Sequence, residues 1–215
     1  MVAAANSKAE IRDAIIADLE SKFNDFDALP GDEYKSEKYD LHSRQGRHEG
    51  AVMTLTKGTI PGLTLEMHAT FRAKMPENVK KMNSEVTMTK LDTLDGASVI
   101  HQHIKMPMLM TNRSLINLVS VKENDDGTVV ILNTSQKNED LLEQYKDKVG
   151  KDVIACNYFN YQKLTPVEGG LNIQMATCMD PMGSIPDMFK NKAATRMLKN
   201  AEKMYHFMMT GEVLK

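Results

Sequence analysis

The first regular pattern along the chain is a set of apolar residues at helical spacing. Ser7-Lys8-Ala9-Glu10 has the form of a capping box, in which the serine and glutamate side chains cap a first helical turn. The apolar residues that follow recur every four positions: Ile11, Ile15, Leu19 and Phe23. The pattern predicts a helix that begins after Ser7 and ends before Leu29-Pro30-Gly31.

The period changes to two over residues 63–73. Apolar side chains occupy the odd positions of this stretch, and polar side chains occupy the even ones. The alternation predicts a half-buried strand with Phe71 on its apolar face. Pro61-Gly62 supplies the turn before it, and residues 52–56 are its expected hairpin partner.

Further strands follow along the chain, and turn sequences separate several of them. The strands are expected at about residues 86–92, 97–106, 115–123, 128–135, 152–163 and 170–179. The turns are Asp95-Gly96, Asp125-Asp126-Gly127 and Glu168-Gly169-Gly170. Short turns between consecutive strands predict an antiparallel meander.

Three other segments are less regular. Residues 32–50 are polar and ambiguous, although a strand could start near Tyr39 or Leu41. Residues 75–84 predict a short helix or loop, and residues 138–148 predict a short helix within a longer connection.

A basic amphipathic helix is expected at the C-terminal end. Ser184-Ile185-Pro186-Asp187 fits a helix start, because serine caps, proline is tolerated in the first turn and aspartate suits the positive end of the dipole. Its apolar stripe is Phe189, Ala193, Met197, Ala201, Met204, Tyr205 and Met208. Its other face carries Lys190, Lys192, Arg196, Lys199 and Lys203, which form either a solvated surface or a membrane-binding one.

These elements predict an α+β fold in which a curved antiparallel sheet grips the long C-terminal helix. A sheet with one apolar face has to cover that face, and the last helix is the long element available. The 215 residues fit one domain, residues 1–215, without a repeat or a low-complexity linker.

The charge, the cysteines and the methionines of the chain bear on its binding partners and its compartment. The net charge of −2 does not favour nucleic-acid binding, and no signal peptide or run of about 18 apolar residues is present. Cys156 and Cys178 are expected to be reduced thiols, which predicts a cytoplasmic protein, although a disulfide between them stays open. The 17 methionines suit either an ordinary core or a surface that adapts to varied apolar partners.

Three polar residues interrupt the apolar faces of the predicted strands: Gln102, Asn133 and Thr177. A buried amide costs roughly 1–3 kcal/mol unless a hydrogen-bond partner satisfies it. The three side chains therefore either satisfy one another, bond a carbonyl near the sheet end, or serve a ligand. Apolar walls with a few placed polar groups are typical of small-molecule sites.

The sequence offers little catalytic or metal-binding chemistry. His101 and His103 share a strand face that we assign to solvent, without a nearby cysteine or carboxylate at ligand spacing. No nucleophile elbow, phosphate loop or dinucleotide fingerprint occurs. We expect no metal, no cofactor and no enzymatic activity.

Two blocks of sequence resemble the START (steroidogenic acute regulatory protein-related lipid transfer) domain family. The first is the strand that ends in Lys105-Met106-Pro107, followed by Asn112-Arg113-Ser114, where Ser114 stands in place of the family's Asp. The second runs from Asp180 through Gly183 to Ile185-Pro186. The order and spacing of the blocks match the family over about residues 7–210.

The resemblance implies a helix-grip fold that encloses one lipid in a tunnel closed by the last helix and nearby loops. It also implies lipid binding or transfer without catalysis. The acidic–Arg pair of sterol-binding members and the aromatic cage of choline-lipid members are both absent at the matching positions, Gln102, Leu115, Val119 and Thr177. Gln102 and Asn133 match the amides of ceramide-transferring members, Tyr205 falls within a residue of their tyrosine, and Lys80 is near the phosphate-binding cation of phospholipid-binding members.

The predicted function is therefore lipid binding and transfer by a monomer that touches anionic membranes transiently. The polar head of a ceramide- or phospholipid-like ligand would bind Gln102 and Asn133 with help from Tyr205 and Thr177, and Lys80 is a candidate phosphate contact. The expected tunnel lining is Phe71, Ile104, Met106, Met175, Phe189 and Met197. The alternatives are a cyclase-like enzyme of the helix-grip superfamily, which would need an inward-facing acid/base pair, and a lipid sensor that does not transfer its ligand.

Overall fold

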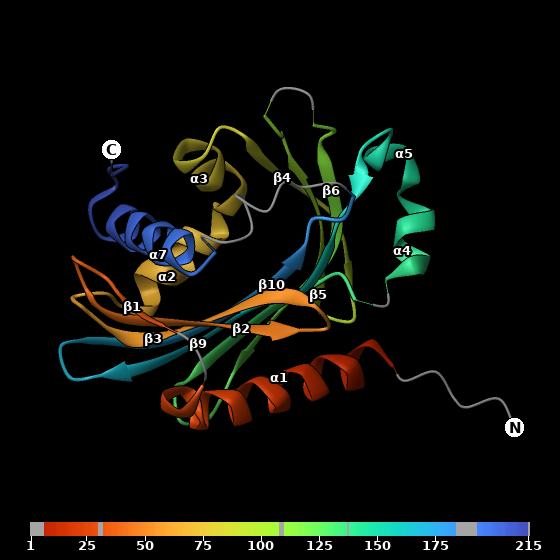
Figure 1. The fold of residues 1–215 in the computed structure, drawn as a ribbon. Coiled ribbons are helices and arrows are strands. Elements are labelled where there is room, and N and C mark those ends of the chain that lie inside the picture. Colours follow the sequence, from red (N-terminus) through yellow and green to blue (C-terminus); the bar gives the residue numbers. More distant parts are fainter. Residues whose placement is uncertain (1–6, 30–31, 108–109, 137, 184–192, 215) are drawn as a thin grey trace, which may run out of the picture.

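The computed structural model describes residues 7–29, 32–107, 110–136, 138–183 and 193–214 (Figure 1). These residues form one ten-stranded sheet of order β1-β2-β3-β10-β9-β7-β6-β5-β4, with the short β8 pairing in parallel with β6. The strands are β1 (Glu33–Lys35), β2 (Asp40–His48), β3 (Ala51–Pro61), β4 (Val86–Leu94), β5 (Ala97–Ile104), β6 (Arg113–Glu123), β7 (Val129–Thr134), β8 (Val153–Ile154), β9 (Cys156–Val167) and β10 (Gly170–Asp180).

The described helices lie on both faces of this sheet (Figure 1). They are α1 (Lys8–Asn24), α2 (Leu65–Ala73), α3 (Met75–Met82), α4 (Glu139–Gln144), α5 (Lys146–Val149) and α7 (Ala193–Thr210), with a 3-10 turn, η1, at Phe26–Ala28. The first helix has the predicted capping box, since the Glu10 amide donates to Ser7 Oγ and the Ser7 amide donates to Glu10 Oε2. The α+β helix-grip architecture predicted from the sequence is confirmed.

Most of the predicted meander is confirmed by strand pairing. β4 to β7, then β9 and β10, follow one another through antiparallel hairpins, and the ambiguous residues 32–50 form β1 and β2. Residues 75–84 contain α3, and residues 138–148 contain α4 and most of α5. The expected start of the last helix at Ser184 lies outside the described residues.

The strand predicted at residues 63–73 is wrong, because this segment forms α2. Thr64 caps the helix by accepting a hydrogen bond from the Met67 amide. The buried residues of the helix, His68 and Phe71, are three positions apart and share one helical face, whereas Met67 is 37% exposed. The expected hairpin with residues 52–56 is therefore also wrong.

Strand β3 instead lies within the sheet, between β2 and β10. It pairs with β2 on one side and with β10 on the other, as Met175 opposite Thr56 illustrates. After β3, the chain crosses through α2 and α3 to β4 at the far edge of the sheet. This crossover places α2 and α3 on the same concave face as α7 (Figure 1).

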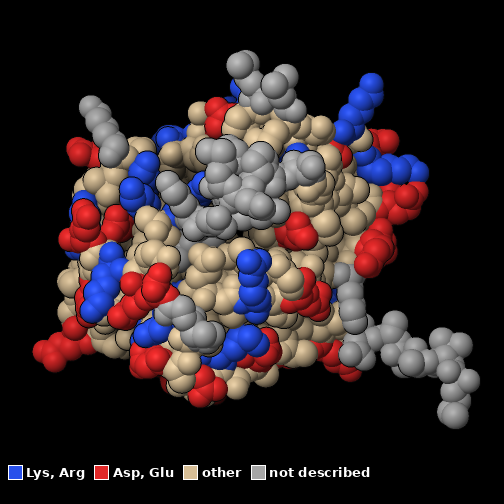
Figure 2. All heavy atoms as spheres, viewed as in Figure 1, with Lys and Arg blue, Asp and Glu red and all other residues tan. Residues whose placement is uncertain are grey.

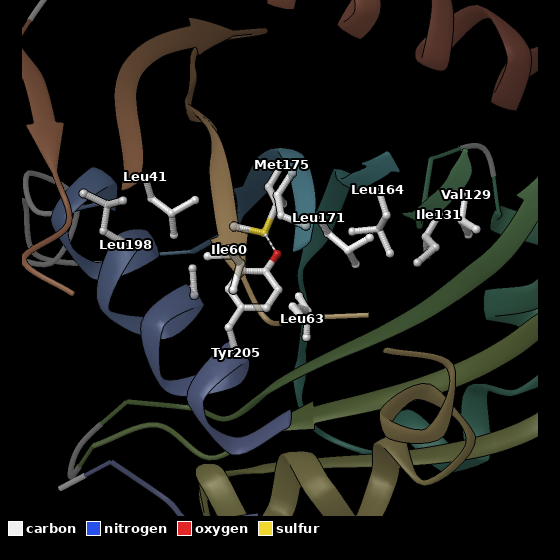
Figure 3. Close-up of a cluster of buried hydrophobic side chains, with 12 residues drawn as sticks. Leu41, Ile60, Leu63, Val129, Ile131, Leu164, Leu171, Met175, Leu198 and Tyr205 are labelled. Atoms are coloured by element: carbon white, nitrogen blue, oxygen red, sulfur yellow. Dashed lines mark hydrogen bonds between the residues drawn. The ribbon is translucent and has the colours of Figure 1, made fainter. Parts of the chain in front are cut away.

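Three apolar clusters hold the helices to the sheet. On the convex face, α1 and the turn after it pack Leu19, Phe23 and Phe26 against strands β3, β7, β9 and β10. Helices α4 and α5 cover β5 and β6 further along through Leu141 and Val149. On the concave face, α7 buries its apolar stripe against the sheet (Figure 3). That cluster comprises Leu41, Ile60, Leu63, Val129, Ile131, Leu164, Leu171, Ile173, Met175, Leu198, Ala201 and Tyr205.

Candidate functional site

Four amide side chains from four strands form a hydrogen-bonded array on the concave face. Asn157 of β9 donates from Nδ2 to Oδ1 of Asn117 on β6 (3.3 Å) and to Oδ1 of Asn133 on β7 (3.2 Å). Asn117 in turn donates from Nδ2 to Oε1 of Gln102 on β5 (3.4 Å). Asn117 and Asn157 are buried, whereas Gln102 and Asn133 are half-buried. The array links β9 to β5 across the middle of the sheet.

An irregularity in the sheet brings Asn157 into this array. Cys178 of β10 pairs with Phe159, but the next residue, Met179, pairs with Asn157, so Tyr158 is an extra residue in β9. Without the bulge, Asn157 would share the convex face with Phe159 and Tyr161. With it, Asn157 turns to the concave face and also donates to the Asn133 carbonyl (3.0 Å).

The direction of these hydrogen bonds determines what the array presents. Two series of hydrogen bonds start at the Asn157 donor. One runs through Asn117 to the amide oxygen of Gln102, and the other ends at the amide oxygen of Asn133. The side-chain NH₂ groups of Gln102 and Asn133 make no hydrogen bond within the part of the chain that the structure describes. Since each NH₂ group carries two N–H donors, the array offers uncharged donors to an oxygen acceptor.

The described residues do not fully cover the concave face around the array. Asn160 of β9 lies between Asn133 and Thr177 in the strand register, yet it is exposed. Thr177 is half-buried and donates from Oγ1 to the sulfur of Met197 on α7 (3.8 Å). Ile100 and Ile104, which share this face of β5 with Gln102, are also half-buried. Polar and apolar groups thus stay accessible in the middle of this face.

Tyr205 and Met175 lie elsewhere on the concave face, inside the packed core. The Tyr205 hydroxyl donates to the Met175 sulfur at 3.0 Å, and both residues are at most 1% exposed (Figure 3). Burial raises the pKa of the Tyr205 hydroxyl far above its usual value, so it stays protonated. These two predicted site residues therefore lie between α7 and the sheet, where they bond to each other rather than to the amide array.

The remaining predicted lining residues are dispersed. Phe71 is buried on α2 against Phe207 of α7, with ring centroids 6.2 Å apart in an edge-on arrangement. Ile104 and Met106 lie at and just beyond the end of β5, half-buried. Lys80 is exposed on α3. Phe189 lies outside the described residues.

One inward-facing histidine was missed. His68 of α2 is 2% exposed, and its Nε2 donates to Oε1 of Gln162 on β9 (3.0 Å). Burial is the main cause that lowers the pKa of His68, to about 4. The strand predicted at residues 63–73 put His68 on the polar face, whereas α2 turns it toward the sheet. No carboxylate of the described residues is bonded to it.

His101 and His103 do not lie on a solvated face, as the sequence suggested. Their strand β5 is covered on that side by α4 and α5, and Val99 is buried there. His101 Nε2 donates to Ser114 Oγ (3.1 Å), and Ser114 donates to Asp152 (2.7 Å), which also lies 3.4 Å from His103. The Ser114 hydroxyl donates a hydrogen bond to a carboxylate and accepts one from His101. The histidine therefore does not act as a base toward this serine.

Arg113 ties β6 to the segment that precedes the last helix. Its guanidinium donates to the carbonyl oxygens of Pro181 (2.7 Å) and Met182 (3.0 Å), and also to that of Thr111. Arg113 is 3% exposed. Its role is therefore structural in this arrangement.

The comparisons with known proteins agree with this architecture. Human STARD10 shares 20% sequence identity over 89% of this chain and 78% of its own, with a TM-score of 0.70. Human StAR-related lipid transfer protein 5 covers 95% of this chain and 99% of its own at 14% identity and a TM-score of 0.68. A STAR-related lipid transfer protein from Xanthomonas axonopodis matches at 13% identity over 82% and 97%, with a TM-score of 0.64. No family model and no curated protein match the sequence.

The chain has the START fold. Two of these structural neighbours are named lipid transfer proteins, and the shared fold agrees with the resemblance found in the two sequence blocks. The amide array, the accessible concave face and α7 occupy one side of this START fold, opposite α1 (Figure 1).

We also searched the described residues for metal sites, membrane-spanning helices and surface hollows. Within the described ranges, no three His, Cys, Asp or Glu residues are placed to hold a metal ion, and no helix is long and apolar enough to cross a membrane. An open surface hollow of about 540 Å³ lies between the start of α2 and the β9–β10 turn. It is lined by residues 62–66, 166, 167 and 169–171, and so does not include the amide array.

Proposed function

We propose that the chain binds one lipid between the concave face of its sheet and α7 and transfers it between membranes. The observation that carries this proposal is the amide array, because its free NH₂ groups lie on a partly accessible face flanked by apolar side chains. A packed core would bury such groups only with partners. Apolar walls with a few fixed polar groups are typical of ligand sites.

The donors of the array favour a ligand with uncharged oxygen acceptors. Gln102 and Asn133 would bind the amide carbonyl, ester carbonyl or hydroxyl groups of a ceramide- or phospholipid-like molecule, and Thr177 and Asn160 lie beside them. Asn117 and Asn157 would hold the two amides in place. A quaternary ammonium group fits this array poorly, because N–H donors repel a cation.

The apolar part of the ligand would run along side chains of the same face. Ile104, Met106 and Met197 are half-buried and would contact an acyl chain directly. Tyr205, Met175 and Phe71 would form the packed wall behind it. Phe189 stays a proposed lining residue, and Lys80 stays a proposed phosphate contact. The names of the structural neighbours support lipid transfer as the activity. We propose that it needs no reaction and no cofactor.

Membrane contact would use the solvent-facing side of α7. Arg196 and Lys199 are exposed there, and anionic lipid attracts such residues by about 1 kcal/mol each. Figure 2 shows positive and negative side chains intermixed on the face it presents, so the contact would be local and transient. We propose that the chain acts there as one domain and as a cytoplasmic monomer.

A liposome transfer assay tests this function. Purified protein should move a fluorescent ceramide from donor to acceptor vesicles, and Gln102→Leu should reduce its preference for ceramide over a hydrocarbon-tailed dye. Gln174→Leu, on the convex face of β10, is the matched amide control and should leave the preference unchanged. Binding without transfer would favour a lipid sensor, and no binding would contradict the proposal.

A further inference from the structure

Helix α2 brings two nitrogen-bearing side chains over the concave face at one end of the sheet. Phe71 anchors the helix against Phe207 of α7, and His68 reaches Gln162 of β9. Arg72 follows His68 by four residues and therefore lies on the same side of the helix, one turn further along. His68 and Arg72 are near enough for the arginine charge to lower the pKa of His68 further.

His68 has a buried hydrogen-bond acceptor without a partner. Its Nε2–H donates to Gln162, so Nδ1 is the unprotonated nitrogen of the neutral ring. No atom of the described residues bonds to Nδ1, although this nitrogen is inaccessible to solvent. Buried polar atoms usually have a partner, so this position suits a donor that the chain itself does not supply.

Arg72 is a partly buried cation without an ion pair among the described residues. Its guanidinium makes no hydrogen bond or ion pair to any residue that the structure describes, and its Nε is buried without a partner. Burial lowers the pKa of Arg72, and the more distant Glu123 opposes that shift. An arginine fork that is free and partly desolvated is well suited to carboxylate or phosphate oxygens.

One residue of the concave face in the strand row of Gln162 is exposed. Val121 of β6 shares the concave face with Asn117 and Val119, yet it is 43% exposed. It lies in the strand row Val121–Ile131–Gln162, whose Gln162 side chain is bonded to His68. The neighbouring row on this face is Val119–Asn133–Asn160, roughly 7 Å away along the strands.

We propose that Arg72 and His68 bind the anionic oxygen group of an acidic lipid whose neutral polar linkage lies on the amide array. The separation of the two rows fits the distance between a lipid's linkage region and an acid group at its head. Arg72 donates to the anionic oxygens, and a P–OH group of a phosphate monoester would donate to His68 Nδ1. This inference rests on the proposed function and specifies that the ligand carries a negative charge.

The experiment compares three probes that share one acyl chain: oleyl alcohol, oleate and oleoyl lysophosphatidic acid. Their dissociation constants are measured by displacement of a fluorescent neutral lipid from the full chain. We expect at least one of the two acids to bind about 10-fold tighter than the alcohol. Arg72→Gln should abolish this preference while leaving the affinity for the alcohol within about twofold.

Matched variants separate a specific site from general charge and from misfolding. Lys122→Gln removes an exposed positive charge from β6 and should leave the preference intact, and Arg72→Lys should retain part of it. If the ligand is a phosphate monoester, His68→Gln should weaken the binding of lysophosphatidic acid more than the binding of oleate. Equal weakening of both acids would assign the site to carboxylates and phosphates alike.

The outcomes distinguish this inference from the proposed function. If the alcohol and both acids bind with equal affinity, or if Arg72→Gln keeps the acid preference, the anion site is contradicted while lipid binding stands. If no probe binds to the folded chain, the proposed function itself is contradicted.

Discussion

Asn157 Nδ2 lies 3.3 Å from Asn117 Oδ1, which joins β9 to β6 although β7 runs between them. The same nitrogen also bonds to the side-chain and backbone oxygens of Asn133 on the intervening strand. Asn157 is thus the donor that orients the whole array, and both free NH₂ groups depend on it. A site built in this way holds its polar groups fixed before a ligand arrives.

Removal of Asn157 should therefore destabilise the fold and loosen the site together. Asn157→Ala leaves the Asn117 and Asn133 oxygens without their donor, which should cost about 1–3 kcal/mol in the free energy of unfolding measured with urea. Asn160→Ala is the control, since Asn160 is exposed and bonds to no described side chain; its cost should stay below about 0.5 kcal/mol. Equal effects of the two variants would contradict the central role of Asn157.

His68 should make stability depend on pH. Its pKa is about 4 in the folded chain, against 6.5 for an ordinary histidine in the unfolded chain, so the unfolded chain binds the proton more readily. The contribution of the neutral folded form is fully present above pH 6.5 and is lost as pH falls toward 4, by about 3 kcal/mol in total. Urea unfolding of wild type and His68→Gln between pH 4 and 7 measures it, and the difference between the two should shrink as pH falls. A difference that does not change with pH would show that His68 is not buried in its neutral form.

Tyr205 should contribute through packing more than through its hydroxyl. Tyr205→Phe removes only the bond to the Met175 sulfur and should cost less than about 1 kcal/mol, whereas Tyr205→Ala should cost about 3–5 kcal/mol. Lipid selectivity of Tyr205→Phe should match wild type in the transfer assay. A change of selectivity in the phenylalanine variant would mean that the hydroxyl leaves Met175 to meet the ligand.

Arg113 should hold the segment before the last helix. Arg113→Met removes the donors to Pro181 and Met182 and should cost about 2–4 kcal/mol, with faster amide hydrogen exchange at residues 179–183. Arg47→Met, at an exposed site that donates to the Gly50 carbonyl, should leave both measurements close to wild type. Unchanged exchange in the Arg113 variant would place the restraint on this segment elsewhere.

The sequence predicts the sheet well, because alternation over long strands is a strong signal. It also identifies Gln102, Asn133 and Thr177 as polar residues on an apolar face, and the same test applied to β6 finds Asn117 beside Leu115 and Val119. These predictions rest on local period, which the strands β5, β6, β7 and β10 keep.

Two features could not be predicted in this way. Residues 63–73 alternate and also fit helical spacing, and the choice is made by the packing of Phe71 and His68 against α7 and β9. The absence of Val and Ile from Leu65–Ala73 and the cap at Thr64 are the local signals for a helix. Asn157 reaches the concave face only through the bulge at Tyr158, which depends on the register of β10.

Native mass spectrometry of the protein purified from cells tests the central claim most directly. We expect one lipid per chain, with an amide, ester or hydroxyl linkage that accepts hydrogen bonds from Gln102 and Asn133, and a lower occupancy in Gln102→Leu than in Gln174→Leu. A folded chain that carries no lipid from cells and takes up none from vesicles would contradict the account.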